Sequence, residues 1–225
     1  KDIVETNVRT IALKDHAGDD LPPHVEEYKK RFDMTQAVLV KYMEALAAVA
    51  DDGVVDYKKQ ITEVSSAASG AKFVEKADAD LISGALNLIA KLATDASRQK
   101  LLREMVTRSD PAIQNITQAL SESVQTAYLG MLNNEGIALE GFVKSPEIDK
   151  NPGSSRLARL VLRDYKSEIE SRKKTVGTYV KALEKIAEGH ATLAQHIGSF
   201  SSKEFITQMR EFETELKELH KQLKN

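Results

Sequence analysis

The chain has 225 residues, 41% hydrophobic and 29% charged, which is enough apolar material for a buried core in one domain. Its 32 Lys and Arg nearly balance its 34 Asp and Glu, so no overall charge attracts it to nucleic acid or to an anionic membrane. Cysteine is absent, which excludes a disulfide framework, a thiolate metal site and a cysteine nucleophile. Few aromatics, 11 Gly and 5 Pro favour long helices over sheets.

The N-terminal part of the chain predicts a short helix followed by a long one. Residues 1–20 contain an amphipathic stretch over 2–16, which a Gly- and Pro-rich run ends. Pro22 and Pro23 suit the first turn of the next helix, which we expect to reach Ala50. Its apolar residues recur at helical spacing and predict one buried face: Val25, Tyr28, Phe32, Leu39, Tyr42, Leu46 and Val49.

The middle of the chain predicts three further helices, over about 57–70, 75–108 and 111–143. The run Ser109-Asp110-Pro111 combines a capping residue with a proline, and it predicts that a new helix starts at Pro111. The inward residues expected for that helix are spaced by three or four positions: Ile113, Leu120, Val124, Ala127, Met131, Ala138 and Phe142.

The C-terminal part predicts a main loop over 144–154, a very long helix from Ser154 or Ser155 to Ile197, and a last helix capped by Ser201 or Ser202. Two apolar ladders mark the buried faces of these helices. They are Val176, Val180, Leu183, Ala187, His190, Ala194 and Ile197, and Phe205, Met209, Phe212, Leu216, Leu219 and Leu223. The whole chain, 1–225, therefore predicts a single all-α domain, an elongated antiparallel bundle with long, coiled-coil-like helices.

Motifs that carry chemistry are missing from the sequence. No Glu-x-x-His pair of a di-iron bundle occurs, nor a zinc, calcium-loop or nucleotide-binding motif, so we expect no metal and no cofactor. His190 lies on an apolar ladder, where a hydrogen-bonded core histidine is the default expectation.

Two basic stretches are candidates for contact with a partner or ligand. The first includes Arg98 and Arg103, and the second, over 156–174, includes Arg172 and Lys173. Such stretches can bind phosphates or anionic head groups, but acidic residues are mixed in and aromatic residues are not interleaved. We therefore favour solvated faces with intrahelical ion pairs, and we expect no nucleic-acid partner.

The segment Leu88 to Leu120 contains Ser97-Arg98-Gln99-Lys100-Leu101-Leu102 and Asp110-Pro111-Ala112-Ile113-Gln114. This segment resembles uncharacterised bacterial all-helical envelope proteins, several of which look like exported lipoproteins. The resemblance implies a periplasmic or envelope bundle whose leader has been removed. The first residue, Lys1, is compatible with such processing, and any membrane contact is expected through a lipid anchor upstream of it.

Three functional hypotheses follow from the sequence. The first is a non-enzymatic interaction or scaffold protein with a protein partner, contacting it through residues such as Arg98, Arg103, Arg172, Lys173 or His190. The second is a helical sensor or carrier whose ligand site is lined by Gly130, Gly136, Gly141, Tyr128, Tyr179 and His190. The third is an enzyme with a site built from Glu184, Glu188 and His190.

Overall fold

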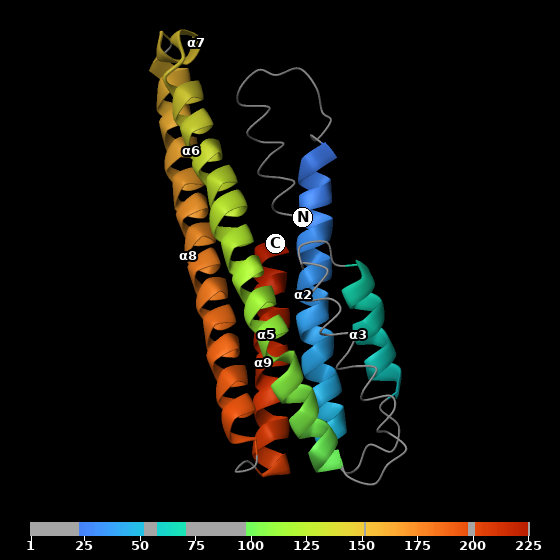
Figure 1. Ribbon diagram of the computed structural model, residues 1–225. Helices are drawn as coiled ribbons and strands as arrows, with labels where there is room; N and C mark the ends of the chain where they lie inside the picture. Colours follow the sequence, from blue (N-terminus) through green and yellow to red (C-terminus); the bar gives the residue numbers. More distant parts are fainter. Residues whose placement is uncertain (1–22, 52–57, 71–97, 151, 198–200, 225) are drawn as a thin grey trace. The chain divides into compact units, whose positions relative to one another are not determined.

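The computed structural model describes residues 23–51, 58–70, 98–150, 152–197 and 201–224, and in these ranges the protein is all-α (Figure 1). The helices are α2 (Pro23–Ala50), α3 (Lys58–Gly70), α5 (Arg98–Ser123), α6 (Leu129–Val143), α7 (Pro146–Asp149), α8 (Pro152–His196) and α9 (Ser202–Lys224), with a π-helical turn, η1 (Val124–Tyr128), joining α5 to α6. The helix expected over 2–16 and most of the one expected over 75–108 lie outside the described residues.

The chain forms two compact units that share several helices. Unit 1 comprises Lys1–Lys29, Ser123–Tyr179 and Leu219–Asn225, and unit 2 comprises Lys30–Glu122 and Val180–Glu218. The long helix α8 contributes its first part to unit 1 and its last part, from Val180, to unit 2.

Helix α2 is the most deeply buried helix segment of unit 2. From Thr35 to Ala50 no residue is exposed. Ion pairs along α2 connect it to its neighbours: Lys41 to Glu63 of α3, and Glu44 and Asp51 to Lys217 and Arg210 of α9. Because Glu44 precedes Asp51 whereas Lys217 follows Arg210, α2 and α9 run antiparallel, as Figure 1 also shows.

The apolar ladders read from the sequence form the core. Phe32, Leu39, Tyr42, Leu46 and Val49 of α2 are all buried, as are Phe205, Met209, Phe212, Leu216 and Leu219 of α9. On α8, Val176, Val180, Leu183 and His190 are buried, whereas Ala187, Ala194 and Ile197 are half-buried. The faces predicted for α2, α8 and α9 are thus confirmed at these buried positions.

The predicted helix start at Pro111 is wrong, because α5 continues through it. Pro111 and Thr107, whose carbonyl the proline leaves without its helical partner, both lie on the exposed face, where water can satisfy that carbonyl. The buried stripe of α5 passes the proline without interruption, from Met105 and Val106 to Ala112 and Ile113. The free energy gained by burying this stripe therefore outweighs the local preference of Ser109-Asp110-Pro111 to end one helix and start another.

The inward face predicted for the following segment is confirmed at Ile113, Leu120, Val124 and Ala138 but is wrong at three positions after Val124. The expected Ala127 and Met131 are only half-buried and Phe142 is exposed, whereas Tyr128, Leu132, Leu139 and Val143 are buried. The π-helical turn explains the shift: the Leu129 N–H bonds the Val124 carbonyl five residues back, so the turn accommodates one additional residue. After this turn the residue that follows each mispredicted one is buried: Tyr128, Leu132 and Val143.

A side chain of α2 holds this turn in place. The Tyr28 hydroxyl donates to the Ser123 carbonyl at 2.7 Å and accepts a hydrogen bond from the Ser123 hydroxyl at 2.8 Å. A widened turn leaves carbonyls without the normal helical partner, and Tyr28 supplies one. Burial raises the pKa of Tyr28, so the phenol keeps the proton that it donates.

Helix ends follow the sequence closely. The expected loop over 144–154 contains the single turn α7, and α8 begins at Pro152, slightly earlier than expected, with the proline in the first turn, where it costs no hydrogen bond. At the start of α9, the Glu204 N–H donates to the Ser201 hydroxyl oxygen while the Ser201 N–H donates to the Glu204 carboxylate, which is a capping box. The predicted cap at Ser201 is confirmed.

Helices α8 and α9 of unit 2 approach each other closely at Gly189 of α8. A Cβ atom there would lie 2.5 Å from Cζ of the buried Phe212 ring of α9. Gly130 and Gly141 of α6, by contrast, have nothing within 4 Å of such an atom. The glycine that permits close packing is therefore Gly189.

We expect Gly189→Ala to lower the free energy of unfolding by about 1–3 kcal/mol, because the new methyl overlaps a ring that packing holds in place. The matched control is Gly177→Ala on the same helix, where nothing lies within 4 Å and the side chain points outward. That change should stabilise the protein by up to about 1 kcal/mol through helix propensity. Urea unfolding followed by circular dichroism measures both, and an equal response of the two variants would contradict the assignment.

Candidate functional site

The sequence-predicted contact residues do not gather into one site. Arg103 is exposed on α5, and Arg98 is the first residue of that helix. Arg172 bonds Glu168 and lies 3.6 Å from the buried Glu135 carboxylate, and Lys173 pairs with Glu170 at 2.9 Å. His190 belongs to unit 2 and the group around Arg172 belongs to unit 1. Arg172 and Lys173 are thus engaged in ion pairs within the protein.

His190 forms a buried hydrogen-bonded chain across three helices of unit 2. Its Nε2 atom lies 2.9 Å from the Tyr42 hydroxyl of α2, and its Nδ1 atom lies 2.8 Å from Oδ1 of Asp110 on α5. Gln114 Nε2 donates to the same Asp110 oxygen and to the Ala187 carbonyl of α8. The expected core histidine is confirmed.

The proton positions in this chain follow from its two ends. Burial raises the pKa of Tyr42, which keeps the phenol protonated and able to donate. The hydrogen bond from His190 lowers the pKa of Asp110, which keeps its carboxylate ionised and able to accept. With Nδ1–H donating to Asp110 and Nε2 accepting from Tyr42, every member of the chain has a hydrogen-bond partner, so the chain is complete without a ligand.

The proposed acid–base group of Glu184, Glu188 and His190 is not assembled. His190 is fully buried, whereas Glu184 and Glu188 are exposed and line different grooves, on the α5 side and the α9 side of α8. The two carboxylates are four residues apart, yet both lie outside the face that His190 shares with the core. The structure therefore does not place Glu184, Glu188 and His190 at one site, as the enzyme hypothesis required.

The suggested ligand-lining residues divide between the two units. Tyr128 and Tyr179 are buried in unit 1, which also contains the half-buried Gly130 and Gly136 and the exposed Gly141, whereas His190 belongs to unit 2. The structure therefore does not bring these residues to a common site in either unit.

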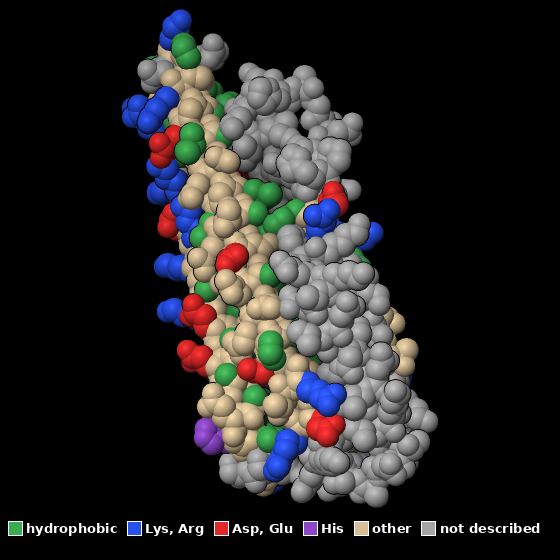
Figure 2. All heavy atoms as spheres, in the orientation of Figure 1, with side chains coloured by type: hydrophobic (Ala, Val, Ile, Leu, Met, Phe, Trp, Pro, Cys, Tyr) green, Lys and Arg blue, Asp and Glu red, His purple; other side chains and the backbone are tan. Residues whose placement is uncertain are grey.

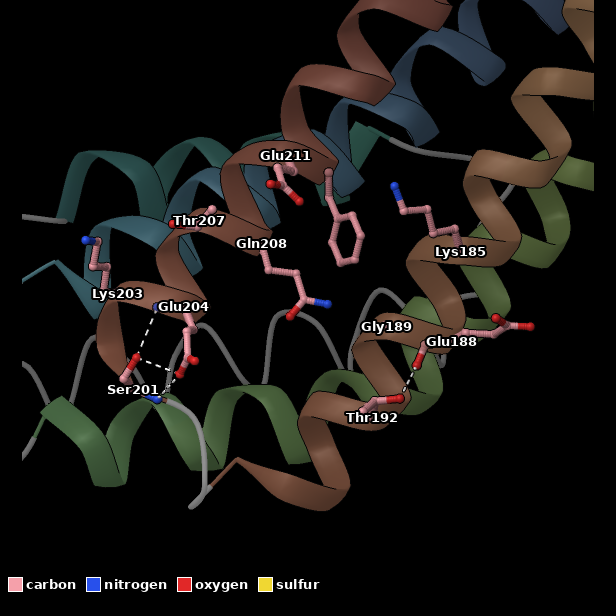
Figure 3. A pocket seen from close by; sticks show the side chains of 11 residues that line it. Lys185, Glu188, Gly189, Thr192, Ser201, Lys203, Glu204, Thr207, Gln208 and Glu211 are labelled. Atoms are coloured by element: carbon pink, nitrogen blue, oxygen red, sulfur yellow. Dashed lines mark hydrogen bonds between the residues drawn. The ribbon is translucent and has the colours of Figure 1, made fainter.

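A groove of about 840 Å³ runs between α8 and α9 in unit 2. Figure 3 shows Lys185, Glu188 and Thr192 along α8, and Thr207, Gln208 and Glu211 along α9. Its charged side chains are of both signs, and Ser201 and Glu204 at its end already bond each other in the capping box. The groove thus offers no concentrated charge for a ligand to recognise.

Helices α6 and α8 form an antiparallel hairpin in unit 1, closed by α7. Glu140 pairs with Lys166 on one flank of the hairpin, and Glu135 pairs with Arg172 on the other. Phe142 follows Glu135 by about two helical turns and Val161 precedes Arg172 by about three, so both lie on the Glu135 flank.

Exposed apolar side chains gather on this flank near α7. Phe142 is 45% exposed, Val161 41%, Leu157 65% and Leu160 53%. Leu160 and Val161 follow Leu157 by three and four residues, so Leu157 lies between them on the outward side of α8. We call these four residues the hairpin surface. Ile137, also exposed, lies about 140° around α6 from Phe142 and is not part of it.

Three arginines border the hairpin surface on α8. Arg156, Arg159 and Arg163 are exposed and follow each other by three and four residues, which places them along one side of the helix. Arg163 pairs with its neighbour Asp164 at 3.1 Å, whereas Arg156 and Arg159 form no ion pair with the described residues. In Figure 2, basic side chains are prominent along this outer edge of unit 1.

Sequence reasoning missed the hairpin surface although a signal was present. Residues 157–162 read Leu-Ala-Arg-Leu-Val-Leu, which is apolar around almost the whole helix, more than one buried face can hold. Ala158 is buried and Leu162 half-buried, which leaves the others outside. For Phe142 no sequence signal was available, because the π-helical turn decided which way it faces.

Searches of the described residues for other kinds of site give no further candidate. They include no group of three or more His, Asp or Glu that could hold a metal ion. Nor does any of their helices have the length and hydropathy that crossing a membrane requires. No protein-family model, curated protein or solved structure matches the chain. The fold therefore defines the class, an all-α helical bundle, with an exposed apolar and basic surface on one hairpin.

We expect Tyr42→Phe to lower the free energy of unfolding by about 1–3 kcal/mol, because it leaves the buried Nε2 of His190 without its donor. Tyr165→Phe, at a half-buried site on α8, is the matched control and should change stability by less than about 0.5 kcal/mol. Chemical unfolding at neutral pH compares the two variants. If Tyr42→Phe leaves the free energy of unfolding unchanged, the Tyr42 hydroxyl makes no net contribution to stability.

Asp110→Asn should weaken the acid sensitivity of the fold. A carboxyl whose pKa is lowered in the folded state stabilises the protein above its unfolded pKa, and that contribution is lost as the pH falls. The free energy of unfolding of the variant should therefore decline less steeply than that of the wild type below about pH 4.5. The free energy of unfolding is measured by urea titration at each pH. An equal decline with pH in the variant and the wild type would contradict the role assigned to Asp110.

Proposed function

We propose that this protein is a non-enzymatic interaction protein that docks onto another component of the bacterial cell envelope through the hairpin surface. The observation that carries the proposal is the exposure of Phe142, Leu157, Leu160 and Val161 at one end of the α6–α8 hairpin. Contiguous exposed apolar side chains are a cost to a protein in water, and a soluble domain that retains them commonly uses them for binding.

The surrounding structure supports a binding role for this end of the hairpin. The pairs Glu135–Arg172 and Glu140–Lys166, together with the buried Ile169, hold α6 and α8 together below it. The hairpin surface thus lies on regular helices rather than on a loop, which lowers the entropic cost of binding. The resemblance of Leu88–Leu120 to exported helical proteins supports the envelope as the compartment.

Site-specific photocrosslinking tests the proposal in cells. A photoreactive residue at Leu160 should give one dominant adduct, whereas the same residue at Lys181, exposed on α8 in unit 2, should not give that adduct. Changing Leu157 and Val161 to Ser should abolish the Leu160 adduct while leaving the thermal unfolding midpoint nearly unchanged, because both side chains are largely exposed. Identical adducts from Leu160 and Lys181, or neither a protein nor a lipid adduct from Leu160, would reject the hairpin surface as a docking site.

A further inference from the structure

We propose that the component bound by the hairpin surface is the anionic head-group surface of a lipid bilayer, into which the apolar side chains insert while the adjoining arginines bind phosphates. This inference rests on the proposed function, because it names the partner of the same surface. It concerns attachment to a membrane surface, since none of the described helices is suited to span one.

The local charge favours an anionic partner although the chain as a whole does not. Between Lys150 and Arg163 the sequence has four basic residues and no acidic one, in contrast to the net charge of −2 for the chain. Arg156 and Arg159 are exposed and form no ion pair with described residues, so their charge is available to a ligand. Each basic residue close to an anionic bilayer strengthens attachment roughly fivefold.

The apolar residues favour lipid over the other anionic partners. Leu157, Leu160 and Val161 are aliphatic, and they lie beside the arginines on the same turns of α8. Binding to a nucleic-acid backbone is electrostatic and gains nothing from three exposed aliphatic side chains. The residues that anchor protein interfaces are more often Trp, Tyr and Arg. Aliphatic residues beside arginines on one helix are typical of helices that lie in the bilayer interface.

The position of the surface suits shallow insertion. Phe142 is in the last turn of α6, and Leu157 to Val161 are in the first turns of α8, on either side of α7. Arginine side chains are long enough to reach phosphates while their aliphatic stems lie against the acyl boundary. The end of the hairpin can therefore enter the interface without opening the packed helices.

Vesicle sedimentation of the full chain, without any lipid anchor, tests this inference. The probe is vesicles of phosphatidylcholine and phosphatidylglycerol in equal parts, with phosphatidylcholine alone for comparison. We expect binding to the anionic vesicles that weakens as salt increases. The double change Arg156→Gln and Arg159→Gln should lower the affinity roughly twentyfold or more, and Leu157→Ser with Leu160→Ser should lower it about tenfold.

The matched control removes the same charge elsewhere on α8. Lys174→Gln with Lys181→Gln changes two exposed basic residues and should leave vesicle affinity within about twofold of the wild type, since both lie outside the hairpin surface. Circular dichroism melting of each variant verifies that the fold is retained. Equal losses in the control and the arginine variant would indicate unspecific electrostatics and overturn the inference.

Failure of the inference can be told apart from failure of the proposed function. No vesicle binding, together with a protein adduct at Leu160, would reject a lipid partner and leave the docking role intact. No vesicle binding and no adduct would reject both. Binding to RNA or to an acidic protein that depends on Arg156 and Arg159 but not on Leu157 and Leu160 would also overturn the lipid assignment.

Discussion

The arrangement of unit 2 depends on satisfying the polar groups that α2 takes into the core. Tyr42 lies on a helix with no exposed residue between Thr35 and Ala50, so its hydroxyl requires a buried partner, and His190 is that partner. Since His190 also bonds Asp110, the rotational settings of α2, α5 and α8 are coupled. Burial of Leu39, Met43 and Leu46 supplies the driving force, and the chain of hydrogen bonds selects one arrangement.

Unit 1 depends on a different constraint, the π-helical turn. By adding a residue to one turn, Val124–Tyr128 rotates all of α6 and places Leu132, Leu139 and Val143 against the core while it turns Phe142 outward. The Tyr28–Ser123 hydrogen bonds stabilise this irregular backbone. The feature that distorts the helix is thus also the one that creates part of the hairpin surface, in accord with the tendency of such turns to occur near functional sites.

The polar constellations of the two units differ in what they can do. The Asp110–His190–Tyr42 chain resembles a proton relay in composition, but each member already has its partner, so its role is to fix packing. The arginines beside the hairpin surface are exposed and attached to apolar neighbours. We therefore propose a binding role for the exposed arginines, and a purely structural role for the Asp110–His190–Tyr42 chain, whose polar groups already have partners.

The sequence by itself determined the helical class, most helix boundaries and the buried faces of α2, α8 and α9, because regular 3/4 spacing and local caps such as Ser201 act over a few residues. It did not determine that α5 continues through Pro111, that the face of α6 shifts by one residue, or that Leu157 and Leu160 stay exposed. Those outcomes depend on contacts between segments far apart in the chain, Tyr28 with Ser123 above all. Only the tertiary structure decided them, because long-range burial and hydrogen bonding outweighed the local preferences of the backbone.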